Sequence, residues 1–255
     1  MKLTILGCSG SIPGPESPAS GYLVESGGSR IVLDLGNGTL GALQRVADPF
    51  ELDAVLFSHL HPDHCADFGA LTVLRRYHPA PPYDTRQRRL PVFAPAEAPE
   101  RFAALHATDE AERQQTDLSD VFDFVPMPQE LRIGPFHVQP VPVAHVCPAW
   151  GFRITADDAV LAYTGDTGPC PALDELGRDA DVLLAEASWP HHPEAPDGLH
   201  LSGLQAAEAA VSSGARRLLL THLQPWSDPH AIRAEAAAVF DGPVEVVEPG
   251  REYVV

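Results

Sequence analysis

Short apolar segments with the composition of β-strands occur in both halves of this 255-residue chain, and each half continues into alternating strands and helices. In the first half the expected strands are 2–7, 21–26, 30–35 and 53–58, and the expected helices are 38–47 and 64–77. In the second half the expected strands are 121–127, 131–141, 151–155, 159–164, 181–187, 216–222 and 244–249. Two halves of this kind indicate two sheets packed face to face with helices outside, an αββα sandwich.

Two helix starts are marked by short polar residues in the C-terminal part of the chain. Ser202 is expected to cap a helix over 203–213 and Asp228 a helix over 229–240, because their side-chain oxygens can accept from free N–H groups. The stretch 79–120 is rich in proline and acidic residues, and we interpret it as a surface excursion. The prediction is therefore a single α/β domain over residues 1–255.

The formal net charge of −18 makes a large nucleic acid an unfavourable partner, because nucleic-acid binding depends on Lys and Arg that neutralise phosphates. The stretch 75–89 stands apart, since it contains five arginines. It is interpreted either as a solvated face or as a substrate-guiding surface, and a small phosphate compound is not excluded.

The sequence contains no apolar run of the ~20 residues that a membrane helix needs and no signal-peptide pattern at its start. We therefore expect a cytoplasmic protein without a membrane partner. Its four cysteines are scattered without a C-x-x-C pair, which favours free thiols over disulfides or a cysteine zinc site. Cys65, next to His64, is interpreted as an ordinary buried thiol or, alternatively, as a redox-sensitive one.

A cluster of metal-type side chains follows the strand expected at 53–58. His59, His61, Asp63 and His64 lie within six residues, in the sequence HLHPDH. Imidazole and carboxylate groups suit Zn²⁺, with Mn²⁺ or Fe as alternatives, and four of them exceed what one tetrahedral ion with an open position requires. Two divalent metal ions are therefore expected.

Three further candidates each follow an apolar run, namely His145, Asp166 and His222. A single histidine after a strand is usually an ordinary surface or core residue. Together, however, the three could complete a two-metal site, in which one carboxylate bridges the ions.

The motifs LGCSGS, LDLGNG, SHLHPDH, YTGDT and LLLTH, in this order with His145 between the third and fourth, resemble the metallo-β-lactamase superfamily and most of all its ribonuclease Z-like branch of dinuclear phosphodiesterases. The resemblance implies the αββα metallo-β-lactamase fold and a homodimer. It also implies a first metal held by His59, His61 and His145 and a second held by Asp63, His64 and His222, with Asp166 bridging them.

The same resemblance assigns catalytic roles to Glu186 and His200, which match a glutamate and a histidine characteristic of that branch. The departing sugar oxygen of a phosphodiester needs a proton, and a histidine oriented by a carboxylate can donate it. Asp63 could also align the attacking water. Helix capping for His200 and a salt bridge for Glu186 are the structural alternatives.

Only twenty residues separate His145 from Asp166, the interval in which ribonuclease Z carries its tRNA-gripping arm. The segments SPASGYL, RRYHP, AEASW and HLSG resemble segments of bacterial cyclic-nucleotide phosphodiesterases of the atypical class II-like type, which also lack the arm. We therefore expect hydrolysis of a small phosphodiester partner, cyclic AMP, to the 5′-nucleotide. Candidates for stacking on the base are Tyr77, Trp150, Trp189 and Trp226, and core packing is the alternative for each of them.

Three other functions remain open. The chain could be a ribonuclease Z-type tRNA 3′-end endonuclease in which the arginines of 75–89 replace the missing arm. It could be a phosphoribosyl cyclic phosphodiesterase, which is also armless. It could also be a non-catalytic metal-binding interaction domain, which would bind metal and turn over no phosphodiester.

Overall fold

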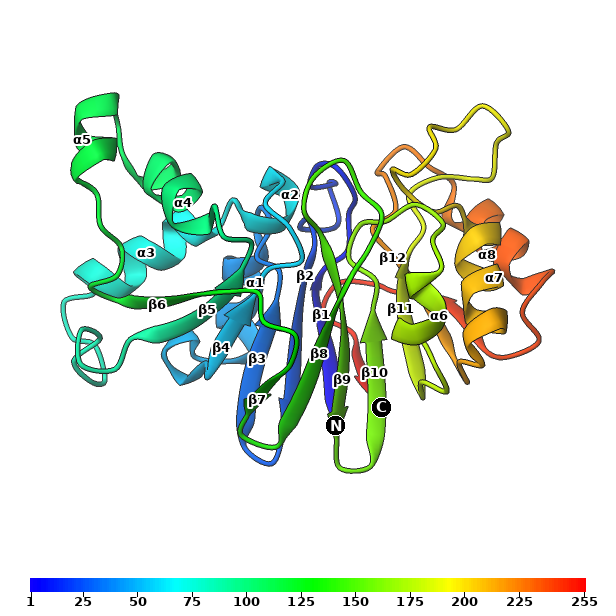
Figure 1. The fold of residues 1–255 in the computed structure, drawn as a ribbon, viewed down its shortest axis with the longest axis horizontal. Coiled ribbons are helices and arrows are strands. Elements are labelled where there is room, and N and C mark those ends of the chain that lie inside the picture. Colours follow the sequence, from blue (N-terminus) through cyan, green and yellow to red (C-terminus); the bar gives the residue numbers. More distant parts are fainter.

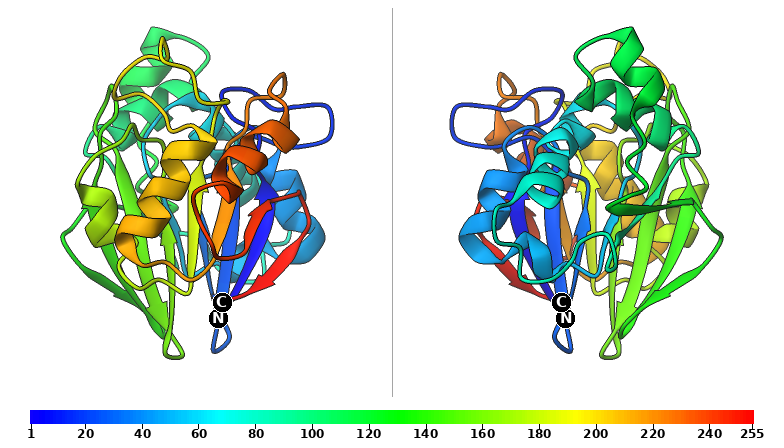
Figure 2. Two further views of the ribbon diagram at one scale, coloured as in Figure 1. Left: turned by 90° about the vertical axis from the view of Figure 1, so that its right-hand side faces the viewer. Right: turned by 90° about the vertical axis from the view of Figure 1, so that its left-hand side faces the viewer.

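The computed structural model describes all residues 1–255 as two seven-stranded sheets packed face to face, with helices on the two outer faces (Figures 1 and 2). The N-terminal sheet has the strand order β14 (Glu252–Val254), β1 (Lys2–Gly7), β2 (Gly21–Ser26), β3 (Ser29–Leu33), β4 (Ala54–Leu56), β5 (Leu90–Ala94) and β6 (Phe122–Pro126). The C-terminal sheet has the order β13 (Val244–Val246), β12 (Leu218–Thr221), β11 (Val182–Glu186), β10 (Ala159–Tyr163), β9 (Trp150–Ala156), β8 (Phe136–Pro142) and β7 (Leu131–Ile133).

The helices divide into two groups along the chain. The N-terminal group contains α1 (Thr39–Val46), the short 3₁₀ helix η1 (Pro49–Glu51), α2 (Pro62–Cys65), α3 (Phe68–Tyr77), α4 (Ala98–His106) and α5 (Glu110–Gln115). The C-terminal group contains α6 (Ala172–Leu176), α7 (Gly203–Ser213) and α8 (Pro229–Ala237). No helix is both long and apolar enough to cross a membrane.

Three apolar cores separate these layers. One contains inward-facing residues of both sheets, such as Ile5 and Phe152, and the other two lie between each sheet and its helices, for example around Phe68 and Ala206. Both faces of the central strands are thus buried, which explains why β11 reads as a continuous apolar run. The predicted αββα sandwich is confirmed.

Both predicted helix caps are also confirmed. Ser202 accepts from the N–H of Gln205, and the Gln205 side chain accepts in return from the Ser202 N–H, which completes a capping box. The carboxylate of Asp228 accepts from the N–H of His230 at 2.9 Å.

The helix expected over 64–77 is divided into α2 and α3. Asp67, between them, accepts with its side chain from the N–H of Leu40 at 2.8 Å and donates its own N–H to the carbonyl of Leu35 at 3.0 Å. These contacts hold Asp67 against Leu35 and the first turn of α1. The break therefore has a tertiary cause that helical periodicity does not reveal.

The interpretation of 79–120 as a surface excursion is wrong for part of this stretch. It contributes β5, which pairs in parallel with β4 and β6 and buries Leu90, Val92 and Ala94. Buried and partly exposed residues alternate along β5, but Pro91 hides this strand pattern in the sequence, because a proline usually argues against a strand inside a sheet. Of the helices and strands in this stretch, α5 alone has no buried residue and lies on the surface as predicted.

The loops that leave β4, β8, β10 and β12 emerge at the same edge of the sandwich, the upper edge in Figure 1. The two termini lie together at the opposite edge, because β1 and β14 pair antiparallel (Figure 2).

Candidate metal centre

Seven side chains that are far apart in the sequence meet at this edge in two groups that could each hold a cation. The first group is His59, His61, His145 and Asp166, and the second is Asp63, His64, Asp166 and His222. Within each group the ligand atoms lie within 4.8 Å of one another. The structure therefore brings together all seven predicted metal ligands, with Asp166 common to both groups.

Ring nitrogens converge in the first group. His59 Nε2 lies 2.9 Å from His61 Nδ1, which is itself 3.2 Å from His145 Nε2. Burial lowers the pKa of each of these three histidines, most strongly that of His59. They are thus neutral near pH 7 and present lone pairs, which is the form in which imidazole binds a metal.

The second group is almost completely buried and contains unpaired polar atoms. His64 Nε2 lies 3.1 Å from Asp166 Oδ1, and His222 Nε2 lies 3.4 Å from Asp166 Oδ2. His64 Nε2, His222 Nε2 and Asp166 Oδ1 have no hydrogen-bond partner. Because unpaired buried polar atoms are costly, their convergence fits a cation that all of them would bind. The donors are only nitrogen and oxygen, as Zn²⁺, Mn²⁺ and Fe accept.

The orientation of His64 depends on Asp34, to which the sequence analysis gave no role. His64 Nδ1 donates to Asp34 Oδ2 at 2.8 Å, which leaves Nε2 facing the second group. The fully buried Asp34 carboxylate also accepts from Ser58 N–H and Oγ, both at 2.7 Å, and from the Tyr163 hydroxyl at 2.8 Å. The available signal was an acidic residue directly after the apolar run IVL, residues 31–33.

His222 is positioned by its backbone and by two small residues. Its φ of 58° lies in the left-handed region, which is unusual for a non-glycine residue. Ser20 Oγ lies 2.9 Å from His222 Nδ1, which leaves Nε2 for the centre. A Cβ at Gly10 would lie 2.2 Å from the His222 carbonyl oxygen, so only glycine allows this approach.

Glu186 and His200 form a pair next to the shared aspartate. His200 Nδ1 lies 2.9 Å from Glu186 Oε1 and 3.8 Å from Asp166 Oδ2. Glu186 is fully buried at the end of β11 and accepts from Thr167 N–H at 2.8 Å and Ser188 Oγ at 3.0 Å. Burial disfavours the charged imidazole, but the charge and hydrogen bond of Glu186 outweigh it and raise the pKa of His200. His200 is therefore suited to hold a proton at neutral pH.

Asp63 combines its place in the second group with a backbone contact. Its Oδ2 accepts from the Ser11 N–H at 2.9 Å and lies 3.6 Å from His64 Nε2. The loop that contains Ser11 is thereby held against the centre.

None of the histidines that the sequence analysis set aside enters these groups. They are His78, His106, His137, His191, His192 and His230. His137 pairs with Glu130 at 2.6 Å, for example. Cys65 is buried and its thiol donates to the Leu60 carbonyl, which agrees with an ordinary buried thiol.

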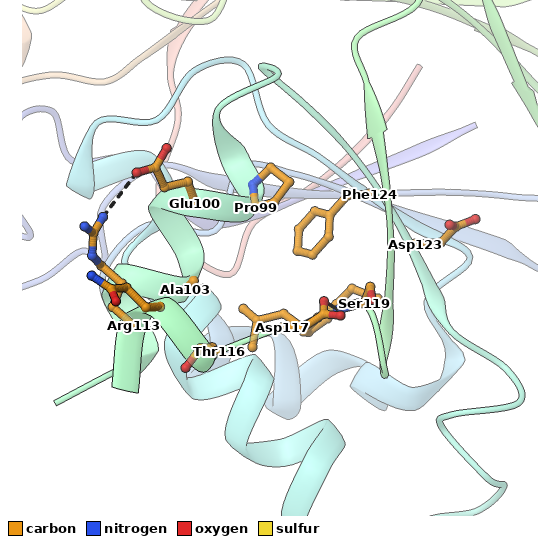
Figure 3. Close-up of a pocket in the computed structure, with 12 residues that line it drawn as sticks. Pro99, Glu100, Ala103, Arg113, Thr116, Asp117, Ser119, Asp123 and Phe124 are labelled. Atoms are coloured by element: carbon orange, nitrogen blue, oxygen red, sulfur yellow. Dashed lines mark hydrogen bonds and ion pairs between the residues drawn. The ribbon is translucent and has the colours of Figure 1, made fainter. Parts of the chain in front are cut away.

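A hollow elsewhere in the molecule has no comparable chemistry. This cavity of about 490 Å³ is lined by residues of α4, α5 and β6 and of the segment between α5 and β6, and Figure 3 shows several of its side chains. Its wall contains the ion pair of Glu100 with Arg113, at 3.1 Å, and no member of the metal groups. The reactive side chains are concentrated at the strand ends instead.

Comparisons with known proteins identify the family and the fold. Residues 18–223 match the family described as the beta-lactamase superfamily domain. An uncharacterized protein of Mycobacterium leprae is 45% identical, over 99% of this chain and 88% of the relative. A ribonuclease Z of Mycolicibacterium gilvum is 30% identical, over 96% and 93%. The crystal structure of the metallo-beta-lactamase fold protein YhfI from Bacillus subtilis superposes with a TM-score of 0.86 at 27% identity, over 99% of this chain and 98% of that chain.

Proposed function

This chain belongs to the beta-lactamase superfamily and is a metallo-hydrolase, and on that premise we propose that it hydrolyses a small phosphodiester, 3′,5′-cyclic AMP, to the 5′-nucleotide. Two divalent cations, Zn²⁺ or alternatively Mn²⁺ or Fe, would be held by the two groups that share Asp166. When bound, they would supply an activated water and positive charge against the phosphate oxygens. The remaining steps depend on the side chains of this chain.

The hydrogen bond between His200 and Glu186 is the observation that carries the proposal. Hydrolysis of a phosphodiester leaves an alkoxide of high basicity, which requires a proton as it departs. His200 holds that proton at Nε2, because Nδ1 faces Glu186. The His200 ring lies beside the rings of His145 and His222, at centroid distances of 5.6 and 5.4 Å, so His200 lies at the edge of the metal centre. Asp63, on the other side of the shared aspartate, would orient the attacking water.

The segment between His145 and Asp166 supports a small substrate. β9 and β10 occupy most of it and pair in antiparallel register from Ala159↔Ala156 to Tyr163↔Phe152. The segment is thus part of the C-terminal sheet, and no arm extends from it to hold a tRNA. The charge of −18 also opposes a large polyanion.

The four aromatic residues that were candidates for stacking on the base have different surroundings in the structure. Trp150 packs against the core between the sheets, and Tyr77 stacks on His106 in the helical layer. Trp189 contacts His200 edge to face at a centroid distance of 5.1 Å, and Trp226, four residues after His222, is 67% exposed. We propose that Trp189 and Trp226 flank the base, since Trp189 contacts His200 and Trp226 is exposed in the loop that follows His222.

A tRNA 3′-end endonuclease is the second candidate, because the identity to ribonuclease Z reaches 30% over nearly the whole chain. In that case the arginines of 75–89 would have to grip the RNA. Arg75 is buried, however, and Arg76 and Arg89 bind Asp120 and the Ser119 carbonyl. Much of this stretch is therefore engaged within the fold.

The decisive experiment compares three substrates with metal-reconstituted protein, namely cyclic AMP, a phosphoribosyl cyclic phosphate and an unprocessed tRNA, each with a chelated control. Hydrolysis of cyclic AMP that is lost on chelation supports the proposal. Cleavage of tRNA alone would overturn it in favour of the endonuclease, and turnover of the cyclic ribosyl phosphate alone in favour of that phosphodiesterase. Metal binding without any turnover would indicate a non-catalytic domain.

A further inference from the structure

We propose that the arginine-rich stretch 75–89 forms a binding site for a phosphate group, built around the buried Arg75 and separate from the metal centre. Arg75, Arg88 and Arg89 line a cavity of about 220 Å³ together with Tyr83 and Asp53. This inference does not depend on the substrate proposed above.

Arg75 is a buried cation without a negative partner. Its side chain lies at the end of α3 and is 2% exposed. The guanidinium donates only to neutral acceptors: the carbonyl of Arg88 at 2.9 Å, the carbonyl of Val121 at 3.3 Å and the hydroxyl of Tyr83 at 3.4 Å. These three bonds use three of its five N–H groups, so two remain.

The rest of the cavity does not compensate this charge. Arg88 is exposed and lies over the Tyr83 ring at 4.6 Å, without an ion pair to any carboxylate. Arg89 has one distant ion pair, 3.7 Å from Asp123. Asp53 is the one carboxylate in the wall, and its Oδ2 already accepts from the Arg30 N–H at 2.8 Å.

This lack of carboxylates is unexpected in a chain with 35 acidic and 17 basic residues. Arg76, next to Arg75, does have a carboxylate partner, Asp120 at 2.7 Å. A buried charge is costly when it is not neutralised, so a cavity with three guanidinium groups and one engaged carboxylate favours an anion.

The geometry selects a phosphate group among anions. Guanidinium groups match the oxygens of phosphate through paired N–H donors, and several of them can surround one tetrahedral anion. The cavity is smaller than the ~300–1,000 Å³ that hold drug-sized ligands. It therefore fits inorganic phosphate or the phosphate of a nucleotide whose remainder extends into solvent.

The site lies at the opposite end of β4 from the metal centre. Leu52 and Asp53 of the cavity wall precede β4, and His59 follows it. α3 runs between the same two edges, since it begins four residues after His64 and its last turn contains Arg75. A phosphate bound here can thus be present at the same time as a substrate at the metals.

The test is calorimetric titration of metal-loaded protein with inorganic phosphate, and separately with 5′-AMP, in chloride buffer at constant ionic strength. Arg88→Gln removes one wall of the cavity. Arg86→Gln is the matched control, because Arg86 is exposed, carries the same charge and does not line the cavity. Phosphate binding at the metals is common to both variants, so their difference isolates the arginine site.

We expect Arg88→Gln to weaken one phosphate-binding event about tenfold or more, while Arg86→Gln and the metal content stay unchanged. If Arg88→Gln weakens the binding of 5′-AMP but not that of inorganic phosphate, the ligand of this site is a nucleotide. Equal effects of both variants, or a single binding event at the metals in the wild type, would overturn the proposal. If the wild-type protein binds tRNA but no phosphate, and Arg88→Gln abolishes the tRNA binding, the site would bind RNA instead.

A second test uses the wild-type protein and needs no substitution. A crystal soaked with tungstate, a heavier tetrahedral oxyanion, should show density between Arg75 and Arg88 as well as at the metal centre. Density at the metals alone would contradict the site.

Discussion

His64 Nδ1 donates to Asp34 Oδ2 across 2.8 Å, so the second metal group is held by a carboxylate that is not itself in that group. Asp34 has a left-handed backbone, with φ of 58°, and ends the apolar run of β3. Its carboxylate connects Ser58, His64 and Tyr163, and thus both sheets, to one position. A carboxylate that fixes a histidine ring in this way raises its strength as a ligand.

Asp34→Asn should therefore reduce metal affinity roughly 10–100-fold, because the amide can donate to His64 and no longer fixes the Nδ1 proton. The measurement is the metal content per chain after dialysis against a graded chelator series. Asp158→Asn, in the exposed β9–β10 turn, is the control for loss of one acidic charge. Equal metal retention by the two variants would contradict the role of Asp34.

Asp166→Ala and His200→Ala should separate metal binding from turnover. Asp166 belongs to both groups, so its loss should abolish metal binding and activity together. His200→Ala should keep the metals and lower kcat for cyclic AMP by roughly 10²–10⁴-fold, as expected for a general acid. Metal analysis beside steady-state kinetics tests this, and a similar loss of metal in both variants would remove His200 from that role.

The leaving group offers an independent test of His200. An activated aryl phosphodiester departs as a weakly basic phenolate and needs little protonation. His200→Ala should therefore impair bis(p-nitrophenyl) phosphate hydrolysis much less than cyclic AMP hydrolysis. A uniform decrease for both substrates would indicate a positioning effect rather than proton donation.

Gly10→Ala should disturb His222 through its backbone. The added Cβ would lie 2.2 Å from the His222 carbonyl oxygen, and the resulting overpacking should cost about 1–3 kcal/mol of stability together with metal affinity. Gly41→Ala is the control, since a Cβ there meets nothing within 4 Å and alanine favours a helix. Urea denaturation and metal analysis measure both effects, and an unchanged Gly10→Ala protein would show that the loop yields without consequence.

Cys65 should be unreactive despite its place beside His64. Burial raises the pKa of its thiol to about 11, and only the thiolate reacts. At pH 8 on the order of 0.1% is thiolate, so alkylation should be slow in the folded protein and rise about tenfold per pH unit towards pH 11. Mass spectrometry after iodoacetamide treatment measures this, with the partly exposed Cys147 as internal comparison. Rapid modification of Cys65 at pH 8 would support the redox-sensitive alternative.

Much of the fold follows from local sequence. The strands β1, β2 and β11 and the caps at Ser202 and Asp228 were predicted correctly, because apolar runs and N-cap side chains act over a few residues. The failures have non-local causes: β5 forms despite Pro91 because it pairs with β4 and β6, and the contacts of Asp67 with Leu35 and Leu40 divide a helix.

The sequence by itself determined which ligand types the centre contains, since histidines and aspartates that follow apolar runs are visible in one dimension. Only the tertiary structure decided which atoms meet. Asp34 and Tyr163 are 129 positions apart and form a hydrogen bond because two sheets pack face to face. The arginines of 75–89 likewise gained a cavity only when α3 packed against β4 and β5. Local patterns fix the elements, whereas distances between side chains depend on how the sheets and helices pack, and neighbouring residues carry no signal for that.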